Sequence, residues 1–80
     1  MIAVDTNVLV YAHREEFPLH ATARDKLVAL AEDVGPWGIP VFCLGEFVRI
    51  TTHRKVLSPP SSIDQAIAFV DALEASPSFR

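Results

Sequence analysis

Apolar and polar positions along the chain follow two patterns, which predict two strands and four helices. Ile2–Val4 is an apolar run without alternation, as in a strand covered on both faces of a parallel sheet, and Trp37–Pro40 is a short apolar segment that predicts a second strand. Each run precedes a segment with helical character, and a second helical segment follows each of these. The predicted order is strand, helix, helix, strand, helix, helix, which is typical of an α/β fold.

The first half of the chain predicts a short helix and a long one. Thr6 and Asn7 are good helix N-caps, so Val8–Ala12 is expected to be helical, although its β-branched valines leave a longer strand as the alternative. His20–Val34 has apolar residues at helical spacing, and Gly35–Pro36 would end that helix. Its apolar stripe consists of Ala23, Leu27, Leu30, Ala31 and Val34.

The second half predicts two more helices. The first spans Val41–Arg54, and Gly45 within it suggests a close backbone approach, with chance as the alternative. The second follows a capping box, in which Ser62 and Gln65 bond to each other's backbone amides, and it runs to about Ala75. The buried stripes are Leu44, Phe47, Val48 and Thr51 in the first helix, and Ile63, Ile67, Val70 and Leu73 in the second.

Length limits the chain to one domain at most, because it has 80 residues. Half of these residues are hydrophobic, a rich supply for so short a chain. Two strands make a poor sheet, and another strand would be expected where the chain ends. Residues 1–80 are therefore expected to form the N-terminal portion of a single, incomplete α/β domain with a parallel sheet.

Charge and cysteine content exclude several classes. The net charge of −3 gives no global basic signature for nucleic acid. Cys43 is the only cysteine, which excludes an internal disulfide and a cysteine-based zinc site and fits a reducing compartment. The N-terminus lacks a basic leader and no apolar run reaches 18 residues, so a cytoplasmic protein without a membrane span is expected.

One carboxylate, Asp5, directly follows the first predicted strand. Ligands of α/β folds bind at the carboxyl ends of parallel strands, so Asp5 could be a metal ligand there. Alternatively, it forms a cap or an Asx turn with Thr6 and Asn7. A carboxylate among apolar residues needs a partner or solvent in either case.

A second carboxylate, Glu46, lies early in the helix after the second predicted strand. Parallel βα units place their strand-to-helix turns at one sheet edge, so Asp5 and Glu46 could face each other. Two close carboxylates repel unless a cation lies between them, and hard oxygen ligands favour Mg²⁺ or Mn²⁺. The alternative is a solvated Glu46 paired with Arg49 three residues later.

Three stretches resemble the N-terminal part of a PIN-domain ribonuclease: IAVDTNVLVYA, GIPVFCLGEFVRITTHRKV and SIDQAIAFVDAL. Together they cover essentially the whole chain. The likeness is closest to the VapC toxins of bacterial type II toxin–antitoxin modules. It implies an α/β/α sandwich and an RNA endonuclease that uses Mg²⁺ or Mn²⁺. It also implies a cognate antitoxin protein as partner and a homodimer.

The resemblance assigns roles to individual residues. Asp5 matches the first catalytic, metal-binding acid of the family and Glu46 matches the second. Thr6 and Asn7 match the supporting polar positions beside the first acid. The later family acids lie in its second half, beyond Arg80, so this chain alone is expected to be inactive or weakly active.

A small basic cluster is the candidate RNA-binding segment. Arg49, His53 and Arg54 could contact phosphates, because Lys and Arg supply much of the affinity for nucleic acid. The alternative is a solvated helix end, where cations suit the helix dipole. Trp37, Phe42 and Cys43 are expected to be core residues.

Two other functions compete with the nuclease. A phosphatase of the haloacid dehalogenase type also starts from an Asp that ends a strand, but it needs a second Asp two residues later, where this chain has Asn7. The other is a truncated toxin that only binds an antitoxin or dimerises, without catalysis.

Overall fold

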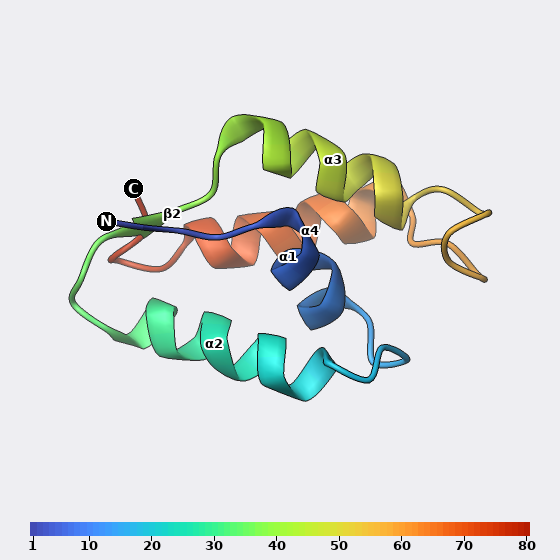
Figure 1. The fold of residues 1–80 in the computed structure, drawn as a ribbon. Helices are drawn as coiled ribbons and strands as arrows, with labels where there is room; N and C mark the ends of the chain where they lie inside the picture. The colour runs from blue at the N-terminus through green and yellow to red at the C-terminus, as the bar shows by residue number, and fades with distance from the viewer.

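Six elements occur in the order that the sequence predicts. The computed structural model describes all residues, 1–80, and its chain path is drawn in Figure 1. The elements are β1 (Ile2–Ala3), α1 (Thr6–His13), α2 (His20–Glu32), β2 (Trp37–Gly38), α3 (Val41–Thr51) and α4 (Ile63–Glu74). The α/β class is therefore confirmed.

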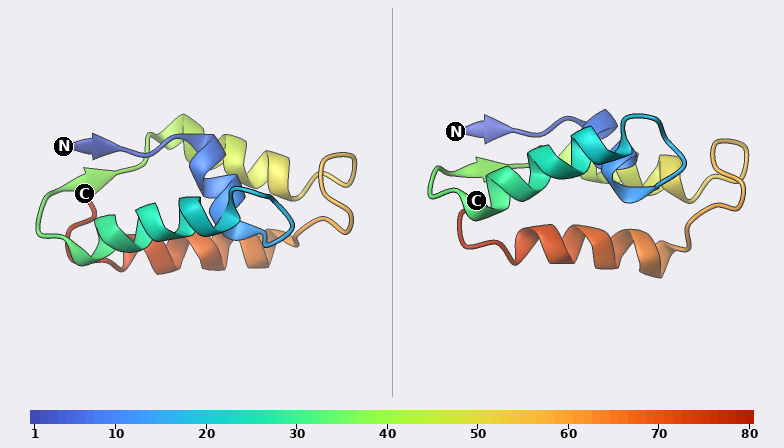
Figure 2. Two further views of the ribbon diagram at one scale, coloured as in Figure 1. Left: turned by 60° about the horizontal axis from the view of Figure 1, so that its bottom comes forward. Right: turned by 90° about the horizontal axis from the view of Figure 1, so that it is seen from below.

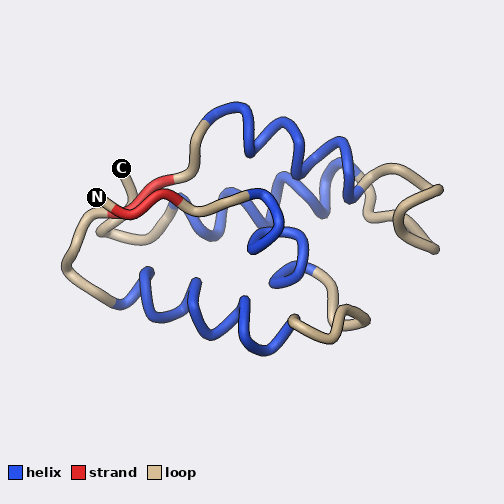
Figure 3. Tube along the Cα trace, in the orientation of Figure 1, coloured by secondary structure: helices blue, strands red, loops and turns tan.

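The strands form a small parallel sheet with β2 at its centre. Ile2 pairs with Trp37, and Ala3 pairs with Gly38. On the other side of β2, the Trp37 carbonyl accepts from the Arg80 amide at 2.8 Å, next to a parallel bridge between Trp37 and Phe79. Both chain termini therefore lie at the strand end of the molecule, as Figure 3 shows.

The helices cover the strands in layers. In Figure 1, α2 and α3 lie on opposite sides of the strand pair, and α1 packs between them against both. The last helix, α4, packs on α3, and both views in Figure 2 show it on the side of the molecule opposite β1. This arrangement is consistent with an incomplete α/β/α sandwich. None of the four helices combines the length and the hydropathy that a membrane span requires.

The core centres on three large apolar side chains that are completely buried, Leu9, Trp37 and Phe47. Burial of Trp37 and Cys43 confirms two of the predicted core residues. The prediction for Phe42 is wrong, because its side chain is 74% exposed. Phe42 lies five residues before Phe47, and five residues turn a helix by about 140°, which moves Phe42 away from the core.

Two predictions about the first half are wrong in detail. The first strand is not covered on both faces, because Ile2 is exposed beside a single strand neighbour. The second helix ends at Glu32, where Asp33 forms the C-cap and its carboxylate accepts from the Val34 amide at 2.7 Å. Val34 therefore leaves the predicted stripe and is 94% exposed.

The second half differs in its helix ends and in one buried face. Helix α3 ends at Thr51 instead of Arg54, although its predicted apolar stripe is buried or half-buried. The capping box before α4 is confirmed. Its buried face is rotated near the start of the helix, where Ile63 and Ile67 are exposed and Ala66 is buried, whereas the predicted Val70 and Leu73 do pack on the core.

The contact between Phe69 and Phe47 explains the rotated face of α4, and the surroundings of Gly45 test the close approach that was expected there. Phe69 stacks on Phe47 at a ring distance of 5.4 Å, and this contact turns the Ala66 side of α4 toward α3. A Cβ added at Gly45 would have no neighbouring atom within 4 Å, so the suggested close backbone approach is wrong.

Candidate functional site

The first candidate acid, Asp5, lies between β1 and α1. It is the N-cap residue of α1 with extended backbone angles, but its side chain forms no capping hydrogen bond. Its carbonyl, not its carboxylate, accepts from the Leu9 amide. The carboxylate is exposed and free for another partner. The side-chain cap considered as the alternative is therefore not formed.

The second candidate acid, Glu46, lies in the second turn of α3 and is also exposed. The only ion pair in the structure joins Arg14 and Glu16. Glu46 therefore forms no ion pair with Arg49. Because β1 and β2 are parallel partners, the chain leaves both strands toward α1 and α3 at the same sheet edge. The fold thus brings together the two segments that carry the acids.

The supporting residues beside Asp5 differ in access to solvent. Thr6 is buried in the first turn of α1, whereas Asn7 is exposed. Asn7 also lines a shallow groove between α1 and α2, together with Tyr11 and Lys26. Asn7 is therefore the more accessible polar group next to the first acid.

The candidate RNA-binding residues occupy two different settings. Arg49 is exposed on α3, one turn after Glu46. His53 and Arg54 are exposed beyond the end of α3, and the His53 Nδ1 accepts from the Lys55 amide at 3.1 Å. Both residues therefore lie outside the helix that was predicted to reach Arg54, because α3 ends at Thr51.

The donor set fits a hard divalent cation in chemistry but not in number. Asp5 and Glu46 offer carboxylate oxygens, the ligands that Mg²⁺ and Mn²⁺ prefer. The structure contains no group of three or more His, Cys, Asp or Glu side chains that could hold a metal ion. Any ion held by this pair would take its other ligands from water or from further groups.

Comparison with known proteins identifies the family. The model of the PIN domain family matches residues 2–80. The chain belongs to the PIN-domain family. VapC ribonuclease Mb2897 of Mycobacterium bovis and ribonuclease VapC43 of Mycobacterium tuberculosis are each 47% identical to this PIN-domain chain over 77 residues, 96% of its length and 52% of theirs.

A third relative supports the same likeness. Ribonuclease VapC25 of Mycobacterium tuberculosis is 41% identical over 80 residues. The PIN-domain chain spans about half the length of the curated relatives it matches. The resemblance to VapC-type PIN toxins drawn from the sequence is thus confirmed.

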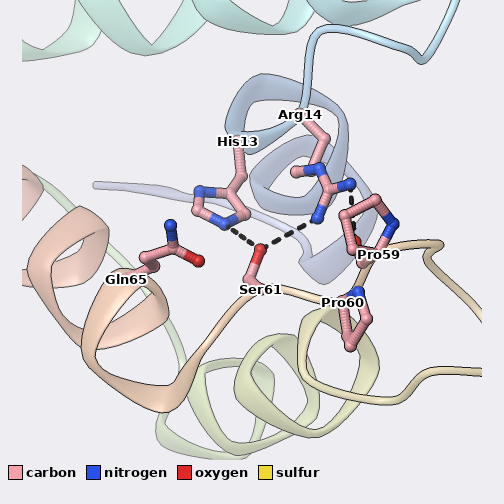
Figure 4. A pocket seen from close by; sticks show the side chains of 6 residues that line it. All are labelled: His13, Arg14, Pro59, Pro60, Ser61 and Gln65. Carbon is pink, nitrogen blue, oxygen red and sulfur yellow. Dashed lines mark hydrogen bonds between the residues drawn. The ribbon is translucent and has the colours of Figure 1, made fainter.

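One polar cluster of the PIN-domain chain was missed by sequence reasoning. His13 and Arg14, at the end of α1, both hydrogen bond to the Ser61 hydroxyl, as Figure 4 shows. His13 is separated from Ser61 by 48 positions, so no local pattern could reveal the contact. Burial, followed by the Arg14 charge, lowers the pKa of His13.

Proposed function

We propose that this chain carries the first two acids of a metal-dependent RNA endonuclease, the toxin of a toxin–antitoxin pair. One observation carries the proposal: two exposed carboxylates without cationic partners, Asp5 and Glu46, lie on the two segments that leave parallel strands at one sheet edge. Similarity to proteins named VapC ribonucleases supports the reaction type.

Each residue has a defined part in this proposal. Asp5 and Glu46 would hold Mg²⁺ or Mn²⁺, which would supply Lewis-acid activation of the phosphate and of a water nucleophile. Thr6 and Asn7 support the first acid. Arg49, together with His53 and Arg54, binds RNA phosphates, because exposed cations supply most sequence-independent affinity.

The proposed partners are an antitoxin protein and a second copy of the toxin. A groove of about 160 Å³ between α1 and α2, lined in part by Val8, Tyr11 and Leu19, has a size and apolar character suited to an antitoxin side chain. Val41 and Phe42 are exposed side by side at the start of α3, and they support the homodimer. We place the complex in the cytoplasm.

A second candidate function is a non-catalytic module that binds the antitoxin or dimerises. One observation favours it: no group of three or more His, Cys, Asp or Glu side chains in the structure could hold a metal ion. Under this proposal residues 1–80 are the N-terminal portion of a PIN domain and keep its docking surfaces while cleaving RNA weakly or not at all.

Metal titration tests the role of the two acids. We expect saturable Mn²⁺ binding that falls by more than about tenfold in Asp5→Asn and Glu46→Gln, because even outer-shell changes commonly cost 10–100-fold. Asp25→Asn, which removes an exposed acid from α2, is the matched control and should bind like the wild type. Equal isotherms for all four proteins would remove the metal site.

An RNA cleavage assay with and without EDTA then separates the two functions. Cleavage that EDTA abolishes, and that both acid variants lose, supports the nuclease. Binding of an antitoxin-derived peptide without any cleavage supports the non-catalytic module. Cleavage that persists in EDTA contradicts the metal-dependent mechanism.

A further inference from the structure

A polar pocket lies between the end of α1 and the start of α4, at the far end of α1 from Asp5. It has a volume of about 390 Å³ and opens to solvent beside the loop that precedes α4. Its walls are His13, Arg14, Pro59, Pro60, Ser61 and Gln65, drawn in Figure 4. No carboxylate and no large apolar side chain lines it.

Two hydrogen bonds meet at the Ser61 hydroxyl at the base of the pocket. Arg14 Nη1 donates to the Ser61 hydroxyl oxygen at 3.2 Å, and this oxygen lies 2.8 Å from His13 Nε2. Ser61 is 5% exposed, so this junction is built into the fold. Burial and the Arg14 charge lower the pKa of His13, which favours a neutral ring. The Ser61 hydroxyl can then donate to Nε2, which leaves the ring proton on Nδ1.

Three side chains around this junction keep unused donors. Gln65 Oε1 accepts from the Ser62 backbone amide at 2.8 Å. The side-chain nitrogen of Gln65 forms no hydrogen bond, so both of its N–H groups lack a protein partner. Arg14 uses Nε and Nη2 on Glu16 and Pro59, and one N–H of Nη1 on Ser61, which leaves one Nη1 N–H free. His13 Nδ1 has no hydrogen bond. Figure 4 shows these three side chains around Ser61.

Donors without acceptors, next to a guanidinium, suit a ligand that is rich in oxygen and negatively charged. Gln65 lies in the first turn of α4, so the positive end of that helix dipole adds to the same preference. We propose that this pocket is an anion site that binds a phosphate group through Arg14, Gln65 and His13. The site is separate from the acidic pair, so it does not rest on the proposed nuclease function.

Glu16 determines how strong such binding can be. It accepts two hydrogen bonds from Arg14 on the solvent side, and it neutralises much of the guanidinium charge. It does not line the pocket, so it weakens the attraction between Arg14 and an anion without occupying the site. Binding is therefore weak in the wild type, and removal of the Glu16 charge strengthens it.

Titration of the protein with sodium sulfate and inorganic phosphate at pH 7.5, followed by NMR of the Gln65 side-chain amide and Arg14 Nε, tests the site. We expect saturable shifts of these signals, a loss of at least about fivefold in affinity for Arg14→Gln, and a gain of severalfold for Glu16→Gln. Arg24→Gln on α2 removes an equal charge from an exposed position and is the matched control. Shifts that do not saturate, or equal weakening by Arg24→Gln and Arg14→Gln, would overturn the site.

The Glu16→Gln variant keeps the test decisive if Arg14→Gln unfolds the protein. It removes an exposed charge and one of the two oxygens that accept from Arg14, and it does not change Ser61 and Pro59, the other partners of Arg14. Unchanged or reduced affinity in folded Glu16→Gln contradicts the proposal.

Two oligonucleotide arms identify the source of the phosphate. A short DNA strand with no terminal phosphate tests a backbone phosphodiester, and the same strand with a 5′-phosphate tests a terminal phosphate. Shifts with both strands assign the site to a nucleic-acid backbone, and shifts with the phosphorylated strand alone assign it to a phosphomonoester. If neither strand nor inorganic phosphate shifts the Gln65 signal, the pocket is only a structural junction.

Discussion

At the scale of single residues, two glycines experience opposite surroundings. A Cβ at Gly38 would lie 3.0 Å from Met1 Cε and 3.1 Å from the Arg80 carbonyl oxygen, whereas one at Gly45 meets open space. We expect Gly38→Ala to lower the free energy of unfolding by about 1–3 kcal/mol through overpacking. Gly45→Ala should raise it by about 0.5–1 kcal/mol, because Ala is the better helix former.

Urea denaturation of both variants measures these changes. The Arg80 amide bonds to the Trp37 carbonyl, which holds the neighbouring backbone in place and makes relief by movement costly. Wild-type stability in Gly38→Ala would show that the Arg80 end of the chain shifts freely. Destabilisation by Gly45→Ala would show that the surface near α3 is occupied.

The lowered pKa of His13 predicts how the stability of the fold depends on pH. The His13 ring packs edge-on against both Phe47 and Phe69, at centroid distances of 5.3 and 4.9 Å, and burial lowers its pKa from the ordinary 6.5. The folded state therefore binds this proton less readily than the unfolded state. The resulting stability is complete above the unfolded pKa and is lost as pH falls from about 6.5 through the lower folded pKa.

Thermal melts between pH 7.5 and 5 check this dependence. The pKa of Glu16 is also lowered, chiefly by its hydrogen bond from Arg14, but its ordinary value of 4.5 places its effect at more acidic pH. His13→Asn should flatten the decline of Tm in this window. The control, His53→Asn, changes an exposed histidine and should retain the wild-type slope. A steep slope in His13→Asn would assign the effect to another group.

At the scale of elements, the start of α4 depends on one side chain. The Ser62 hydroxyl accepts from the Gln65 backbone amide at 3.0 Å, and the Gln65 side-chain oxygen accepts from the Ser62 backbone amide. Ser62→Ala should cost about 1 kcal/mol in urea denaturation. Thr22→Ala, at an exposed site within α2, should stay within about 0.5 kcal/mol. Equal effects would mean that the capping box adds nothing to stability.

The elements also show why sequence reasoning succeeded in part. The capping box and the stripe of α3 depend on residues within a few turns of one another, so local rules predict them. Which stripe of α4 is buried depends on the Phe47–Phe69 contact, and that contact requires the tertiary fold. The end of α2 was misplaced because Asp33 caps it before the Gly35–Pro36 signal is reached.

The two candidate sites also differ in how far the sequence predicts them. The places of Asp5 and Glu46 in the fold follow from two strands that are each followed by a helix, and local patterns in the sequence predict such units. The junction of His13 and Arg14 with Ser61 joins distant parts of the chain through side chains. Strand and helix periodicity contain no information about such a contact.

At the scale of the whole molecule, a small core coexists with large exposed apolar side chains. Only 17 of 80 residues are buried, while Val41 and Phe42 are both largely exposed at the start of α3. Adjacent exposed apolar side chains commonly mark an association surface. We therefore expect concentration-dependent self-association that Phe42→Ser weakens.

Substitutions at the two phenylalanines of α3 distinguish an effect on association from an effect on folding. Phe42→Ser should lower association in sedimentation experiments while changing the free energy of unfolding by less than about 0.5 kcal/mol, because Phe42 lies outside the core. Phe47→Ala should cost about 3–5 kcal/mol, because Phe47 is completely buried and contacts both His13 and Phe69. Unchanged association in a folded Phe42→Ser variant would exclude this surface from the proposed homodimer.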